Sequence, residues 1–296
     1  MEDRINFYKL NSLRKKYNLM TGTAVLLIIV AVLSFFFVAN NGKFWPLFIF
    51  PVVFSIYLFV NKKKVKNEFT SLYKKEVVEA VLNQHFTDVN YEWDEGFSSQ
   101  FVSSMNIISS GNIYHSEDYL SASYKGVHFS QADVEIEEET TDSDGNTSRT
   151  TYFRGRIIVF DYPKRTDFVR TTSKKFRHVR HLRKGEYQSL ELENVEFNKN
   201  FYTYAKEGVD AFYLFTPPMM EKLLEIVRTY GNVGLSCMEG RLYIAINTRR
   251  DAFDTKMMRN LKYDREMQEL AEDVRLIENL IDIVYSVAGV SGNTIS

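Results

Sequence analysis

The segment most suited to chemistry is a concentration of positive charge between residues 162 and 184. It contains nine lysine and arginine side chains and a single acid, Asp167. Because the whole chain has a formal net charge of −1, this local excess predicts an anionic partner. We call this set of side chains the basic stretch: Lys164, Arg165, Arg170, Lys174, Lys175, Arg177, Arg180, Arg183 and Lys184.

Three kinds of anionic partner fit the basic stretch: membrane headgroups, an acidic protein surface, or nucleic acid. The chain itself offers an acidic surface, because residues 133–144 hold seven acids and no lysine or arginine. Nucleic acid is not expected, since only Phe168, Phe176 and Tyr187 offer rings for base stacking. The membrane surface and contact with an acidic surface of this protein both remain open.

Other chemistry has little support in the sequence. No P-loop, Gly-x-Gly-x-x-Gly, His-Glu-x-x-His or Gly-x-Ser-x-Gly motif is present. Cys237 is the single cysteine, which excludes an internal disulfide and a cysteine-based zinc site. His178 and His181 are three residues apart, but the surrounding arginines disfavour a metal cation. We therefore expect no cofactor and no metal, and favour a non-enzymatic protein over an unrecognised enzyme.

Two apolar runs near the N-terminus predict the elements that place the basic stretch at a membrane. Residues 21–39 and 44–60 are uncharged. As helices they are about 28 and 26 Å long, close to the thickness of the hydrocarbon core. Residues 40–43 between them favour a turn, so residues 20–61 are predicted to form a transmembrane helical hairpin. A cleaved signal peptide is the alternative for the first run, and a buried core helix for the second.

Positive charge on both flanks of the hairpin predicts its orientation. Five lysines and arginines lie within residues 1–19 and four lysines within 62–66, whereas the intervening loop carries Lys43 alone. The positive-inside rule then places both termini in the cytoplasm. The predicted location is the bacterial cytoplasmic (inner) membrane, as a multi-pass protein whose remaining residues are cytoplasmic.

The cytoplasmic part is predicted to be α+β, with an antiparallel sheet, flanking helices and a long C-terminal helix. A helical stalk is expected over 62–86 and the α+β domain over 87–254. Within the domain, alternating residues around the turn 142–146 predict a long β-hairpin. The further elements expected are a helix over 194–206, a strand over 209–215, a helix over 217–230, and antiparallel strands over 233–238 and 241–246.

Residues 255–288 predict the long C-terminal helix, followed by a tail over 289–296. Six apolar residues recur at alternating spacings of three and four: Met267, Leu270, Val274, Ile277, Ile281 and Val284. This heptad seam is typical of a helix that packs against another helix or a core. Two alternatives remain open, namely packing on the domain's own core and a coiled coil with another chain.

Three segments of this chain resemble a bacterial family of membrane proteins of unknown function, DUF3137. They are YFRGRIIVFDYPK (152–164), YLFTPPMMEKLLEI (213–226) and LSCMEGRLYIAI (235–246). The resemblance implies a membrane-anchored bacterial protein, and it supplies neither an activity nor catalytic residues.

The function favoured by the sequence is assembly at the membrane. Such a protein would form a homo-oligomer or hold a protein partner at the inner leaflet. The alternative is an anionic-lipid-binding or lipid-handling domain that uses the basic stretch.

Overall fold

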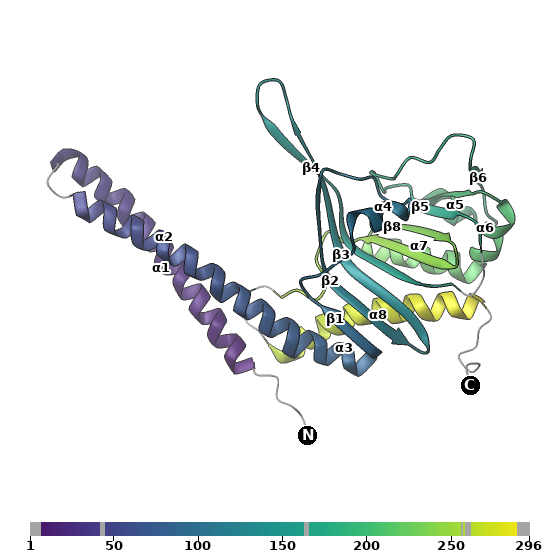
Figure 1. Cartoon of the computed structure of the whole chain (residues 1–296), viewed down its shortest axis with the longest axis horizontal. Helices are drawn as coiled ribbons and strands as arrows, with labels where there is room; N and C mark the ends of the chain where they lie inside the picture. Colours follow the sequence, from purple (N-terminus) through teal and green to yellow (C-terminus); the bar gives the residue numbers. More distant parts are fainter. Residues whose placement is uncertain (1–6, 42–44, 163–165, 256, 258–261, 289–296) are drawn as a thin grey trace. The chain divides into compact units, whose positions relative to one another are not determined.

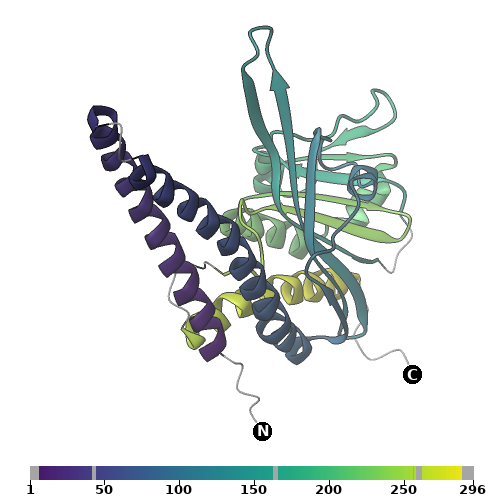
Figure 2. The ribbon, with the colours of Figure 1, turned by 60° about the vertical axis from the view of Figure 1, so that its left-hand side comes forward.

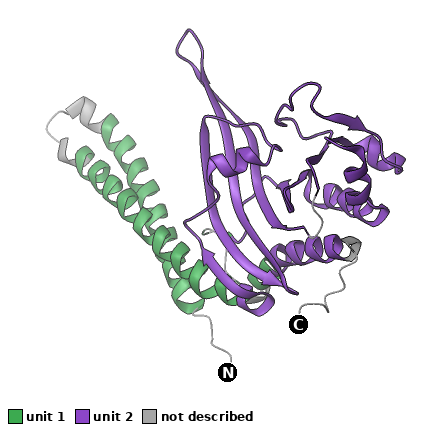
Figure 3. Cartoon of the chain, turned by 45° about the vertical axis from the view of Figure 1, so that its right-hand side comes forward, with its two compact units in different colours: residues 1–81, 254–270 green, residues 82–253, 271–296 purple. Residues whose placement is uncertain are grey.

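The computed structural model describes residues 7–41, 45–162, 166–255, 257 and 262–288. The chain divides into two compact units (Figure 3). Unit 1 comprises residues 1–81 and 254–270, and unit 2 comprises residues 82–253 and 271–296.

Unit 1 is built around two long antiparallel helices, α1 (Phe7–Asn41) and α2 (Trp45–Tyr73) (Figure 1). Near one end, the rings of Phe35 and Phe48 lie 5.6 Å apart. Farther along, the hydroxyl of Ser55 donates to the carbonyl of Ala24 at 3.4 Å. Pro51 lies inside α2.

Within the described residues, one helix is long and apolar enough to cross a membrane. It covers Phe7–Phe36 in α1, and most of its length is not buried within the protein. This stretch contains most of the first predicted span. Of the predicted turn at 40–43, the first two residues belong to the end of α1 and the other two lie outside the described residues, so a two-span membrane hairpin remains an inference from the sequence.

The helix predicted over 62–86 corresponds to the C-terminal part of α2 and the two helical segments that follow it. After α2 come one π-helical turn, η1 (Lys74–Val78), and α3 (Glu79–His85). Apolar side chains four residues apart, including Phe69 and Val77, are buried as the spacing predicts. The ammonium of Lys74 is also buried, and it lies 2.8 Å from the carboxylate of Asp254.

Unit 2 contains a nine-stranded sheet in which all neighbouring strands are antiparallel (Figures 1 and 2). The predicted α+β class is therefore confirmed. The strand order is β1-β2-β3-β4-β9-β8-β5-β7-β6. The strands are β1 (Thr87–Glu92), β2 (Ile113–Tyr124), β3 (Val127–Thr141), β4 (Thr147–Asp161), β5 (Val169–Ser173), β6 (Gln188–Leu190), β7 (Phe201–Ala205), β8 (Asn232–Met238) and β9 (Arg241–Asn247).

Helices and loops cover both faces of this sheet. The short helix α4 (Ser99–Ser104) and residues 105–108 lie on one face, where they pack in a core with alternate residues of β3, β4 and β9. The other face is covered by α7 (Pro217–Tyr230) and α8 (Tyr263–Ala288). Two short helices, α5 (Val195–Asn200) and α6 (Gly208–Leu214), flank β7.

The hairpin predicted around residues 142–146 is confirmed as β3 and β4. A bulge interrupts their register, because Ile136 pairs with Phe153 whereas Glu137 pairs with Thr151. Farther along β4, Gly155 approaches β9 so closely that a Cβ atom would collide with the carbonyl oxygen of Ile246. A glycine is therefore needed where β4 passes from the exposed hairpin into the central sheet.

Two predictions between 194 and 215 are wrong. The helix expected over 194–206 ends at Asn200 and β7 follows, since residues 201–205 alternate between buried and more exposed. The strand expected over 209–215 is helix α6, because Ala211 and Leu214 are buried three residues apart. Residues 201–205 and 209–215 are almost entirely apolar or aromatic, so their sequence does not distinguish the period of two typical of a strand from the period of 3.6 typical of a helix.

The helices and strands predicted farther along the chain are confirmed, with shifts of one residue at the ends of the strands and a larger shift at the start of the C-terminal helix. α7 begins after Thr216 with Pro217 and ends before Gly231, and β8 and β9 form the expected antiparallel pair. The C-terminal helix begins at Tyr263 rather than 255. The predicted tail 289–296 lies outside the described residues.

The heptad seam of α8 packs within the single chain. Leu270, Val274, Ile277, Ile281 and Val284 are buried, with at most 2 % of each exposed, and Met267 is half-buried. Polar contacts also join α8 to the sheet. The guanidinium of Arg156 on β4 lies 3.2 Å from the carboxylate of Asp273, and the hydroxyl of Tyr285 donates to the carbonyl of Asp161 at 2.8 Å. A coiled coil with a second chain would require these side chains to leave their own core.

Candidate functional site: a basic surface with two hollows

The basic stretch does not form one continuous element. It begins beyond β4, passes through β5, and continues as a turn and an irregular segment to β6. Lys164 and Arg165 lie outside the described residues. Lys174, Lys175, Arg177, Arg183 and Lys184 are exposed. These five side chains are the part of the stretch that solvent or a ligand reaches freely.

Two members of the stretch have structural contacts instead. Arg170 on β5 points into the protein, and its Nη1 donates to the carbonyls of Asn106 at 2.8 Å and Arg180 at 2.6 Å. Arg180 is half-buried and donates to the hydroxyls of Ser103 and Ser110. All of β5 is buried between β8 and β7, which explains why Arg170 departs from the surface position that a charge run suggests.

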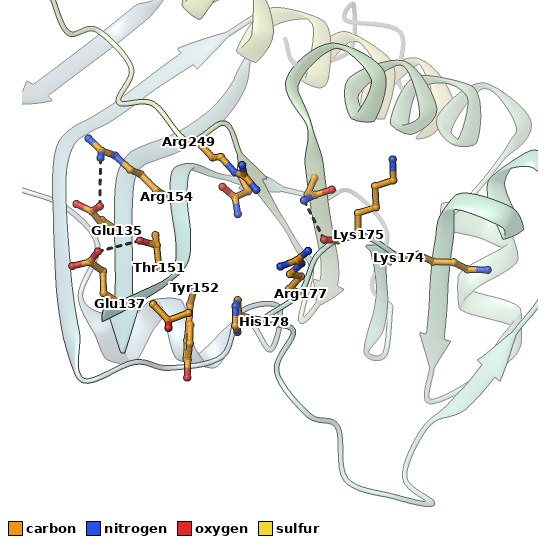
Figure 4. A pocket seen from close by; sticks show the side chains of 13 residues that line it. Glu135, Glu137, Thr151, Tyr152, Arg154, Lys174, Lys175, Arg177, His178 and Arg249 are labelled. Carbon is orange, nitrogen blue, oxygen red and sulfur yellow. Dashed lines mark hydrogen bonds and ion pairs between the residues drawn. The ribbon is translucent and has the colours of Figure 1, made fainter. Parts of the chain in front are cut away.

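A large hollow of about 950 Å³ separates the β3–β4 hairpin from the basic turn that follows β5 (Figure 4). Its acidic wall carries Glu135 and Glu137, and its basic wall carries Lys175 and Arg177. The residues lining this larger hollow are Glu135, Glu137, Thr150, Thr151, Tyr152, Arg154, Lys174, Lys175, Arg177, His178, Asn232, Asn247 and Arg249.

The two walls differ in how their charges are satisfied. Glu135 lies 3.6 Å from Arg154, and Glu137 accepts a hydrogen bond from Thr151 at 3.1 Å. By contrast, no carboxylate among the described residues pairs with the side chains of Lys175, Arg177 or Arg249. Lys174 also lacks a carboxylate partner, but its ammonium lies over the ring of Tyr202, so three other cations of the larger hollow remain available to an anionic ligand. We call these three residues the free cations.

Most acidic residues of the hairpin have partners within the hairpin or in segments next to it. Glu139 pairs with Arg149, and Asp133 accepts from the backbone of Ala252. Asp142 accepts from the backbone and side chain of Asn146, and these bonds lower the pKa of its carboxyl. Most acids of residues 133–144 therefore have partners close to them. In the described part of the chain, no ion pair joins them to the basic stretch.

An aromatic stack links the two walls of the larger hollow. The ring of His178 lies 4.1 Å from the ring of Tyr152, with 11° between their planes. Tyr152 is the bulged residue of β4, so the bulge brings its ring to the basic segment. No group of three metal-ligating side chains in the described residues includes His178 or His181.

A smaller hollow of about 370 Å³ lies on the other side of the same turn. Its floor is formed by β5 and β7, where Arg170 is opposite Tyr204 and Thr172 is opposite Tyr202. Its other wall is the segment 176–182. The residues lining this smaller hollow are Arg170, Thr172, Ser173, Lys174, Phe176, Arg177, Val179, Arg180, His181, Leu182, Tyr202 and Tyr204.

Several residues of the two hollows were not predicted as site residues. Arg154 lies on β4 just before the basic stretch, whereas Arg249 is distant from it in sequence and comes near it through the pairing of β4, β9 and β8. Tyr202 and Tyr204 fall in the segment wrongly predicted as helical. As a strand, this segment directs both rings to one face, which is the signal that could have identified them.

Cys237 is a buried structural residue. Its thiol contacts the hydroxyl of Thr166 at 3.0 Å, and burial raises the pKa of the thiol to about 11. The thiol is therefore protonated at neutral pH, the form that is a poor nucleophile.

The known proteins similar to this chain agree with the resemblance noted from its sequence. Residues 151–285 match the family model of DUF3137, a protein of unknown function. The matched region thus runs from β4 to α8, and it contains the basic stretch and Arg249. No curated protein matches the chain.

Among solved structures, the chain is similar to the crystal structure of the mycobacterial trehalose monomycolate transport factor A, TtfA. The two share 10 % sequence identity, with a TM-score of 0.37, over 70 % of this chain and 93 % of that one. At this identity and TM-score, the likeness carries no argument about function.

Proposed function

We propose that this protein is a membrane-anchored module that binds anionic lipid headgroups on its basic surface. The observation that carries the proposal is the set of free cations, Lys175, Arg177 and Arg249, that line the larger hollow. Each lysine or arginine within a Debye length of an anionic bilayer surface contributes about 1 kcal/mol. A cluster of this kind gives useful affinity only when the domain is held near the bilayer.

The N-terminal helices support such an anchor. α1 has the length and composition of a membrane span. We propose that the second apolar run, residues 44–60, also crosses, so that both termini face the cytoplasm as the flanking charges predict. Covalent anchoring raises the effective concentration of unit 2 at the inner leaflet, so weak headgroup contacts suffice.

Assembly with a protein partner is the second candidate, and one exposed surface favours it. On α6, the side chains of Val209, Phe212 and Tyr213 are 61, 51 and 61 % exposed. An exposed apolar surface with two aromatic rings is typical of protein interfaces. If this surface holds a partner, Phe212→Ser should remove a protein that co-purifies stoichiometrically with the full-length chain. Association through α8 has less support, because its seam is buried.

Lipid retention by the full-length chain tests the main proposal. The detergent-solubilised protein is mixed with equal amounts of phosphatidylglycerol and phosphatidylcholine, and bound lipids are counted by native mass spectrometry. We expect phosphatidylglycerol to be retained in excess, and added salt to weaken the excess. The double variant Lys175→Glu/Arg177→Glu should abolish it.

A matched variant controls for net charge. Lys199→Glu/Arg228→Glu makes the same change of charge on exposed residues outside both hollows, and it should retain phosphatidylglycerol normally. Equal retention of the two lipids by the wild-type chain would refute the proposal. So would an undiminished excess in the Lys175/Arg177 variant.

A further inference from the structure

The side chain of Arg170 is a buried cation without a counter-ion. Only 4 % of the residue is exposed, and no carboxylate in the described part of the chain pairs with it. Nη1 donates to two backbone carbonyls, the Nε atom has no hydrogen-bond partner, and the guanidinium lies 5.5 Å from the ring centre of Tyr204. Burial lowers the pKa of Arg170 to about 10.

A buried charge in this state is costly. Removing a guanidinium from water costs several kcal/mol unless an opposite charge or a full set of hydrogen bonds compensates. The two carbonyls compensate in part, but any N–H donor that reached them would satisfy them without carrying a charge. The fold alone therefore does not explain why a permanent cation lies at this position.

The smaller hollow supplies the space for the missing anion. Arg170 lies on its floor, and its walls add Lys174, Arg177, Arg180 and His181. None of the residues lining it is acidic, in contrast to the larger hollow with Glu135 and Glu137. The ammonium of Lys174 lies 4.8 Å from the ring centre of Tyr202, which holds this cation at the rim.

We propose that the smaller hollow is a binding site for a phosphate group, with Arg170 as its buried anchor. This inference rests on the proposed function in that a lipid headgroup would supply the phosphate. The same chemistry fits a free phosphorylated solute. Guanidinium groups match the oxygens of phosphate in a fork geometry, and several converging cations suit a group that carries more than one negative charge. The tyrosine hydroxyls of β7 add neutral donors at the same rim.

The test measures binding to the full-length chain in non-ionic detergent by isothermal titration calorimetry at constant ionic strength. The two probes are inorganic phosphate and dihexanoyl phosphatidic acid, with dihexanoyl phosphatidylcholine as the uncharged reference. Arg170→Gln removes the charge and keeps a neutral amide donor on a shorter side chain. We expect it to weaken binding of whichever phosphate probe the wild-type chain binds by about tenfold or more.

Two further variants keep the test decisive if Arg170→Gln does not fold. Lys174→Gln changes an exposed residue at the rim of the smaller hollow and should also weaken binding. Lys199→Gln changes an exposed lysine outside both hollows and should leave binding unchanged.

The possible outcomes separate this inference from the proposed function. Binding of phosphatidic acid alone, lost in Arg170→Gln or Lys174→Gln, supports a lipid headgroup as the source. Equal binding of inorganic phosphate supports a solute, and the site stands without a lipid. No binding of either probe, or wild-type affinity in a folded Arg170→Gln chain, overturns the site. In that case, selective retention of phosphatidylglycerol that depends on Lys175 and Arg177 would still uphold the proposed function.

Discussion

Replacing Ile277 by alanine tests whether the seam of α8 belongs to the protein's own core. Ile277 is fully buried in the single chain. The substitution removes three carbon atoms, each worth about 0.8 kcal/mol of transfer free energy. It also leaves a cavity, so the expected loss in the free energy of unfolding is about 2–5 kcal/mol.

The assay is pulse proteolysis of the full-length chain in detergent across a urea series, which reports the folded fraction of unit 2. For a domain of this size, urea lowers the unfolding free energy by about 3 kcal/mol per molar. The midpoint should therefore fall by roughly 1 M. Arg275→Ala, on the exposed side of the same helix, is the matched control and should leave the midpoint nearly unchanged.

The opposite hypothesis makes a different prediction. If the seam joined two chains and contributed little to the fold of each, Ile277→Ala would lower the mass of the particle without a comparable shift in its urea midpoint. A change in mass at an unchanged midpoint would refute the intrachain packing of α8.

Three further predictions address the fold of unit 2. Asp273→Asn should lower the free energy of unfolding by about 3–5 kcal/mol in the same urea assay, because Arg156 would lose its buried counter-charge. The control Asp282→Asn, in an exposed ion pair, should lower it by less than about 1 kcal/mol. Equal effects of the two variants would contradict a buried ion pair between Arg156 and Asp273. Gly155→Ala should lower the stability by roughly 1–3 kcal/mol through its collision with β9, and a wild-type midpoint would show that the strands are not so close. The raised pKa of Cys237 predicts that the free energy of unfolding falls between pH 9 and pH 11, because the unfolded chain loses the thiol proton at lower pH than the folded chain. The expected loss over this range is about 2–3 kcal/mol. Urea titrations at each pH should show a smaller fall for Cys237→Ser.

The sequence predicted those parts of the fold in which local pattern and burial agree. The β3–β4 hairpin shows alternation along residues 132–137 before an Asp-Gly turn, and α7 shows a proline start and a glycine stop. The segments 201–205 and 208–214 were predicted wrongly because their apolar content hides the period. For α8, the spacing of the seam indicates a packed helix face but not the surface against which it packs.

The candidate site was predictable as a charge run and not as a geometry. The basic stretch identified Lys175 and Arg177, which lie on the exposed surface. It also implied an exposed position for Arg170, which is buried because it faces inward from β5. Arg249 reaches the larger hollow only through the pairing of β4 with β9, and such long-range pairing has no local signal in one sequence.

The most direct test of the central claim is hydrogen–deuterium exchange of the full-length chain in nanodiscs of phosphatidylcholine, with and without phosphatidylglycerol. If the basic surface binds anionic headgroups, the backbone amides of residues 174–184 should exchange more slowly in the anionic discs. The Lys175→Glu/Arg177→Glu variant should show no such difference. Identical exchange of this segment by the wild-type chain in both kinds of disc would contradict the account.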